Sequence, residues 1–229
     1  MSPRASLFIA AVALAAIWQL PFGRQLLYPL TLLATFAHEM GHGLTALLVG
    51  AHFDYLQLNA DGSGSAVWRG SPGPFAIAAI AAGGLIGPSL AGVSLLLMAR
   101  STKLSRGLLA LLAALLLACA AIWARNTFGV LYLLCTAVTL ALAARYLPDT
   151  LAALLLHLMA ATLCLAWFTD LDYMFSAQAV VDGVGFPSDS AVIAQVLGFT
   201  YWFWGGLVAA LSLGVLALGI LHIGRSQQR

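Results

Sequence analysis

Long apolar runs are the feature of this sequence that most restricts its fold. A helix needs ~20 residues to cross a hydrocarbon core, and each run is about that long or longer. The runs are residues 5–21, 26–50, 74–98, 107–123, 127–144, 150–169 and 191–223. Charged residues make up only 8% of the chain, and the mean hydropathy is +0.98, which excludes a soluble domain with a wet surface. Because backbone polar groups in lipid must be satisfied within the protein, the runs predict an all-α polytopic membrane protein with six or seven transmembrane helices.

We expect one integral membrane domain over residues 1–229, multi-pass, in the plasma or inner membrane of the cell. The first run could be a cleaved signal peptide instead of a transmembrane helix, because Arg4 precedes it and Ala13-Leu14-Ala15 resembles a cleavage site. It continues through Trp18 without a polar break, which favours a retained helix. The net charge of +2 and the lack of a basic cluster exclude nucleic acid as a partner, whereas the lipid bilayer is an expected one.

The run at residues 26–50 contains the only glutamate of the chain, Glu39, within the pentapeptide His38-Glu39-Met40-Gly41-His42. On a helix, this HExxH spacing places His38 and His42 on one face about one turn apart, where both imidazoles can bind one zinc ion. Glu39 is offset from His38 by about 100° around the helix axis, so it remains free to act as the general base on the metal-bound water. An ionisable group at bilayer depth is costly, which favours a functional site over structural hydrogen bonding.

Residues 51–70, which follow this run, are more polar. Partly alternating segments flank the turn-forming cluster Asn59-Ala60-Asp61-Gly62-Ser63-Gly64. The pattern predicts a short β-hairpin-like insertion after the HExxH helix. An exposed edge strand there is one way to hold an extended substrate by strand addition, and an ordinary connecting loop is the alternative.

A catalytic zinc site needs a third protein ligand, which the pentapeptide does not supply. Since the chain has no second glutamate, the third ligand must be an aspartate, a histidine or an amide. We expect an aspartate from an acidic loop at residues 170–190, which also contains the lower-ranked candidates Asp172 and Asp182. Asp170 is the first candidate because it ends an apolar segment, and Asp189 is the alternative, with helix capping as its competing role. Asn126, which lies in a polar break between two apolar runs, is a candidate for oxyanion stabilisation or polar support.

These features resemble the site-2-protease superfamily of intramembrane zinc metallopeptidases, the M50 class, and most closely its M50B-like branch. The resemblance extends over roughly residues 26–205 and rests on Ala37–Gly43, Asn59–Gly64, Gly84-Leu85-Ile86-Gly87-Pro88, Arg125-Asn126, Asp170-Leu171-Asp172 and Ser188-Asp189-Ser190. It implies a protease that uses Zn²⁺ and Glu39 to hydrolyse peptide bonds of membrane-protein or peptide substrates.

Two other functions are compatible with the same residues. One is a non-catalytic metal-binding membrane scaffold, and the other is an ion transporter whose histidines and aspartates form an ion path. The intact Glu39 favours the enzyme, because transport has no special need for a water-activating base beside the ligands.

Overall fold

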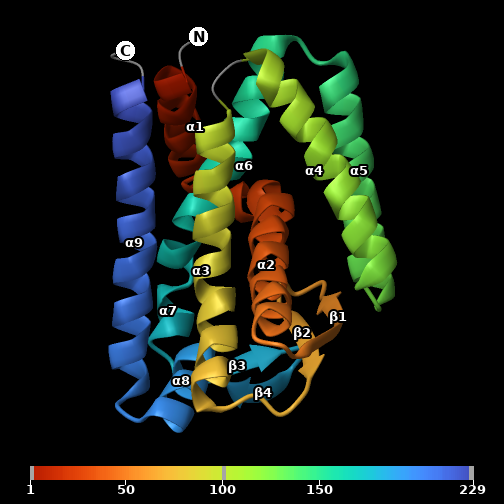
Figure 1. Cartoon of the computed structure of the whole chain (residues 1–229). Coiled ribbons are helices and arrows are strands. Elements are labelled where there is room, and N and C mark those ends of the chain that lie inside the picture. Colours follow the sequence, from red (N-terminus) through yellow and green to blue (C-terminus); the bar gives the residue numbers. More distant parts are fainter. Residues whose placement is uncertain (1–2, 100–101, 227–229) are drawn as a thin grey trace.

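The computed structural model describes residues 3–99 and 102–226 and is mainly helical (Figure 1). The helices are α1 (Pro3–Trp18), α2 (Gly23–Leu48), α3 (Pro74–Met98), α4 (Thr102–Ile122), α5 (Thr127–Tyr146), α6 (Asp149–Thr169), α7 (Leu171–Met174), α8 (Asp189–Leu197) and α9 (Tyr201–Ser226). The strands are β1 (His52–Leu58), β2 (Gly64–Arg69), β3 (Gln178–Val181) and β4 (Val184–Pro187). The predicted helical, polytopic architecture is confirmed.

Within the described residues, five helices are long and apolar enough to cross a membrane, namely α3, α4, α5, α6 and α9. The first apolar run forms α1, which has 16 residues. The second forms the 26-residue α2, which carries the HExxH motif. The last run, expected as one helix, is divided into α8 and α9, because Gly198 and Phe199 adopt positive φ values of 82° and 62°. The chain is therefore a multi-pass membrane protein, and within its described residues five helices meet the length and apolarity of a span where the sequence predicts six or seven.

Helix α2 lies between α3 and the α4–α5 pair (Figure 1). Glycines allow α2 and α3 to approach closely: a Cβ on Gly41 would lie 2.2 Å from the carbonyl oxygen of Gly83, and one on Gly87 would lie 2.9 Å from that of Ala37. Within a membrane, small residues of this kind let helix backbones pack against each other. The consequence is that α3 runs directly along the part of α2 that carries the motif.

Strands β1 and β2 form the antiparallel hairpin that the sequence predicts after the HExxH helix. The outer edge of β1 bonds to the segment before α5, because Leu56 N–H donates to Trp123 O at 2.9 Å and Arg125 N–H donates to Leu56 O at 3.1 Å. Strand β2 is the other edge of this two-stranded sheet, and it packs against α2. Both strands pack against α2: Phe53 of β1 lies against Gly43, and Gly64, the first residue of β2, lies against Glu39.

Residues 170–190, which the sequence predicts as an acidic loop, contain regular secondary structure. They contain the short helix α7 and a second antiparallel hairpin, β3–β4. Asp182 and Gly183 connect the strands with φ values of 49° and 76°, which is the backbone that two-residue hairpin turns require and that Asp-Gly favours. The two hairpins lie together at the end of the bundle opposite the start of α1 and the end of α9 (Figure 1).

Candidate metal centre

Helix α2 presents His38 and His42 on one face, as their spacing predicts. Their Nε2 atoms lie 3.0 Å apart. The Nδ1 atom of His42 lies 2.8 Å from the carbonyl oxygen of Ile80 on α3, so an Nδ1–H donates to this carbonyl. A hydrogen bond of this kind fixes the tautomer and leaves Nε2 available to a metal.

Asp189, the first residue of α8, is the third member of the group. Its Oδ2 lies 3.0 Å from His38 Nε2 and 3.4 Å from His42 Nε2. Ser188, and not Asp189, caps α8, because Ser188 Oγ accepts a hydrogen bond from Ala191 N–H at 3.2 Å. The side chain of Asp189 is therefore free to face the histidines.

The electrostatic environment of Asp189 favours its charged form. Burial by itself would raise the pKa of this carboxyl group. The charge of His42 and the hydrogen bonds from both histidines outweigh burial and hold the pKa of Asp189 well below its ordinary value. A metal ion binds an ionised carboxylate and unprotonated histidines, so in this group it would take the place of the protons on the two Nε2 atoms.

The three ligand atoms fit a zinc ion. Zinc bonds to imidazole nitrogen and carboxylate oxygen are about 2.0–2.2 Å long, so two ligands of a tetrahedral ion lie roughly 3.3–3.6 Å apart. The distances of 3.0, 3.0 and 3.4 Å come close to this range. Two histidines with one carboxylate also match the donor set of catalytic zinc sites, which keep a fourth position open.

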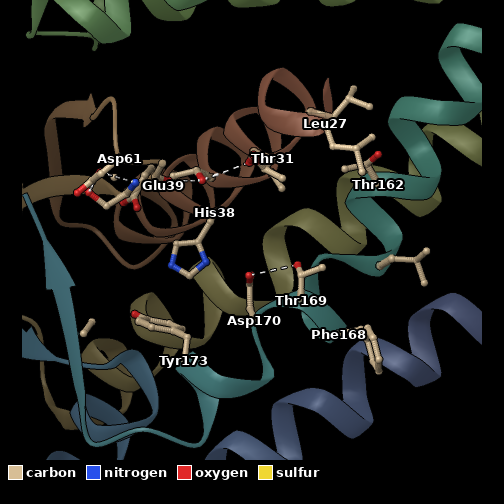
Figure 2. A pocket seen from close by; sticks show the side chains of 18 of the residues that line it. Leu27, Thr31, His38, Glu39, Asp61, Thr162, Phe168, Thr169, Asp170 and Tyr173 are labelled. Carbon is tan, nitrogen blue, oxygen red and sulfur yellow. Dashed lines mark hydrogen bonds between the residues drawn. The ribbon is translucent and has the colours of Figure 1, made fainter. Parts of the chain in front are cut away.

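The structure does not bring Asp170, the first candidate for the third ligand, into this group. Asp170 follows the last residue of α6, and Figure 2 shows its side chain beside His38 in the larger cavity, which Tyr173 also lines. Thr169 Oγ1 donates to its Oδ1 at 3.4 Å, and burial raises the pKa of Asp170. The alternative candidate, Asp189, is the carboxylate that lies with the two histidines.

Glu39 is 5% exposed and lies against β2. A Cβ on Gly64 would lie 2.8 Å from both Cγ and Oε1 of Glu39, so only a glycine lets the strand pass this close. The backbone of Ala66, on the same strand, is within hydrogen-bonding reach of the Glu39 carboxylate. Strand β2 thus fixes the position of the expected general base.

Two cavities meet at the motif. The larger, about 830 Å³, lies between α1, α2, α6 and β3 and is mainly apolar (Figure 2). The smaller, about 540 Å³, lies between the two hairpins and α3 and includes polar side chains. Both are lined by His38, Glu39, Gly64, Tyr173 and Val181. The motif is therefore reached from an apolar side and from a more polar side.

Asn126 does not line either of these cavities. Its Nδ2 donates to Leu58 O at 2.6 Å, and its Oδ1 accepts from Leu58 N–H at 3.3 Å. The amide therefore joins the start of α5 to β1. The oxyanion role that its sequence position suggests has no support from this placement, because both polar atoms of the side chain already bind backbone.

Sequence reasoning missed two residues that contact the group. Tyr173 donates a hydrogen bond to Asp189 Oδ2 at 2.8 Å. Gly84 faces His42 so closely that a Cβ would lie 2.2 Å from the imidazole. The adjacent glycines Gly83 and Gly84 are a signal of close helix approach, but nothing in the sequence indicates that His42 is the side chain they face.

The fold and the site define a multi-pass membrane protein with a candidate metal centre made of an HExxH helix and one distant aspartate. A family model described as Peptidase M50B-like matches residues 7–219. The chain belongs to this family, and the resemblance that the sequence motifs suggest is confirmed. No curated protein and no solved structure matches the chain.

Proposed function

We propose that this protein is an intramembrane zinc metalloprotease that hydrolyses peptide bonds of membrane-embedded substrates in the plasma or inner membrane. The observation that carries the proposal is the approach of Asp189 Oδ2 to His38 Nε2 and His42 Nε2, at 3.0 and 3.4 Å, beside the buried Glu39. Membership of a peptidase family supports the same reaction class.

Each side chain of the site has a distinct role in this proposal. His38, His42 and Asp189 hold the metal ion. Zinc, when bound, supplies a Lewis acid that activates a water molecule and polarises the scissile carbonyl group. The Glu39 carboxylate takes a proton from the attacking water and passes it to the leaving amine, as general acid–base catalysis requires.

The two cavities suit the two parts of a membrane substrate. The larger one is lined by apolar side chains of α1, α2 and α6, so it can accept an apolar segment from the bilayer. The smaller one runs along β2, which is an edge strand next to Glu39. An extended peptide can add to such an edge through backbone hydrogen bonds, which would hold the unwound part of the substrate at the site.

Purified protein reconstituted in vesicles with a set of single-pass model substrates would test the proposal. The substrates carry apolar segments interrupted by glycine or proline, and mass spectrometry detects the products while metal analysis gives the zinc content. We expect Glu39→Gln to keep its zinc and to lose about 10²- to 10⁴-fold in cleavage rate, the usual contribution of a general base. Equal cleavage by the wild type and Glu39→Gln would contradict the proposal.

The same preparations separate the two aspartates and the two rival functions. Asp189→Ala is expected to bind zinc more weakly, through the two histidines that remain, whereas Asp170→Ala is expected to bind it as the wild type does, because only Asp189 lies with the histidines. Zinc flux across the vesicle membrane without cleavage would indicate a transporter. Zinc binding with neither flux nor cleavage would indicate a scaffold.

A further inference from the structure

Tyr173 connects two members of the candidate metal centre that come from different helices. Its hydroxyl group donates a hydrogen bond to Asp189 Oδ2 at 2.8 Å and accepts one from the backbone N–H of Asp189 at 3.2 Å. Its ring stands edge-on to the imidazole of His38, with the ring centroids 5.9 Å apart. Figure 2 shows the Tyr173 side chain next to His38. Tyr173 therefore touches one candidate ligand on α8 and another on α2.

The backbone that carries Tyr173 is held firmly in place. The neighbouring Met174 is fully buried and packs with Leu85 and Val208. Gly205 of α9 lies so close that a Cβ there would be 2.3 Å from the carbonyl oxygen of Met174. The Met174 N–H donates to Asp170 O at 2.8 Å, which closes the turn of α7. Because this segment is packed on both sides, the phenol has a defined orientation toward Asp189.

Asp189 has few other groups that orient its side chain. Among the described residues, the side chains that hydrogen-bond or ion-pair with its carboxylate are those of His38, His42 and Tyr173. The two histidines are themselves candidate ligands, so they would turn their Nε2 atoms to a metal. The Tyr173 hydroxyl is then the side-chain donor that remains to hold the carboxylate, and metal-binding carboxylates are commonly held by such an outer partner.

We propose that Tyr173 is a positioning residue of the metal centre, whose hydroxyl group holds the Asp189 carboxylate in the orientation that binds the metal ion. The inference rests on the metal site of the proposed function and does not depend on proteolysis. Loss of an outer hydrogen-bond partner typically weakens metal binding by about 10- to 100-fold. Removing the hydroxyl group should therefore lower the zinc affinity by a measurable amount.

The test compares zinc dissociation constants of the full-length protein in detergent, measured by competition with a chelator, for the wild type, Tyr173→Phe and Tyr132→Phe. Tyr132 is the matched control because its hydroxyl donates to Pro29 O at 2.7 Å and the residue lines neither cavity. We expect Tyr173→Phe to bind zinc about 10- to 100-fold more weakly, and Tyr132→Phe to match the wild type. Equal zinc affinity of Tyr173→Phe and Tyr132→Phe would overturn the inference.

A double-mutant cycle with Asp189→Ala distinguishes positioning from a general structural role. If Tyr173 acts through Asp189, Tyr173→Phe changes zinc affinity no further in the Asp189→Ala background, within about twofold. An equal loss in both backgrounds would refute the inference, and unfolding temperatures of the zinc-free proteins show whether the variants fold alike. If the wild type binds zinc but cleaves no substrate, the proposed function fails while the role of Tyr173 is still decided by the affinities.

Discussion

Gly84→Ala tests the geometry of the metal centre with one added methyl group. Gly84 lies on α3, where a Cβ would stand 2.2 Å from both Cε1 and Nε2 of His42. Ordinary contact begins at 3.4 Å, so the imidazole or α3 must move by about 1.2 Å, the difference between 3.4 and 2.2 Å. Because His42 Nδ1 is bonded to Ile80 O at 2.8 Å, the displacement falls on Nε2, the expected ligand atom.

A misplacement of about 1 Å in a catalytic group costs on the order of 10²-fold in rate. Overpacking of this kind also costs roughly 1–3 kcal/mol in the free energy of unfolding. We therefore expect Gly84→Ala to fold, to bind zinc more weakly, and to lose about 100-fold in kcat/KM. The zinc content of the purified protein and the rate of substrate cleavage are the two measurements.

Gly214→Ala is the matched control, because Gly214 lies in α9 and nothing is within 4 Å of a Cβ at that position. It makes the same chemical change in a membrane helix without a collision, and we expect wild-type zinc content and activity. If Gly84→Ala kept the zinc content and activity of Gly214→Ala, the close approach of α3 to His42 and its importance for the site would be refuted.

Two further substitutions test the position of Glu39 and the structural role of Asn126. Gly64→Ala places a methyl group 2.8 Å from Oε1 of Glu39, and we expect zinc to be retained while kcat falls by about 10²-fold. Gly185→Ala, on β4 with open space around its Cβ, is its control and should be as active as the wild type. Asn126→Ala leaves the backbone of Leu58 without its two amide partners and should lower the free energy of unfolding by about 1–3 kcal/mol. Unchanged unfolding with a reduced kcat for Asn126→Ala would instead restore the oxyanion role.

The paired histidines and the first hairpin could be predicted because both depend on local geometry. The separation of His38 and His42 by four residues determines that they share a helix face, and their Nε2 atoms lie 3.0 Å apart. The turn-forming cluster at residues 59–64 likewise lies between two strands that pair as expected. The second hairpin was not predicted, because strands of only four residues carry too little alternation to distinguish them from a loop.

The choice between Asp170 and Asp189 could not be made from the sequence. Both residues adjoin the ends of helices, and each could be given a local role. Asp189 meets the histidines because α8 packs on α3 through Ala78, Ala81 and Ile193, while Asp170 is turned toward the larger cavity at the end of α6. Such packing joins segments that are distant in the chain, and no periodic pattern of residues in the sequence predicts it.

The sequence by itself determined the membrane class, the pair of candidate ligands and the expected base. Each of these depends on the length of an apolar run or on residues within about one helical turn. The tertiary structure decided which aspartate joins His38 and His42, that Tyr173 holds it, and how closely Gly84 approaches. These depend on how far helix backbones approach one another, which is set by contacts between segments far apart in the chain.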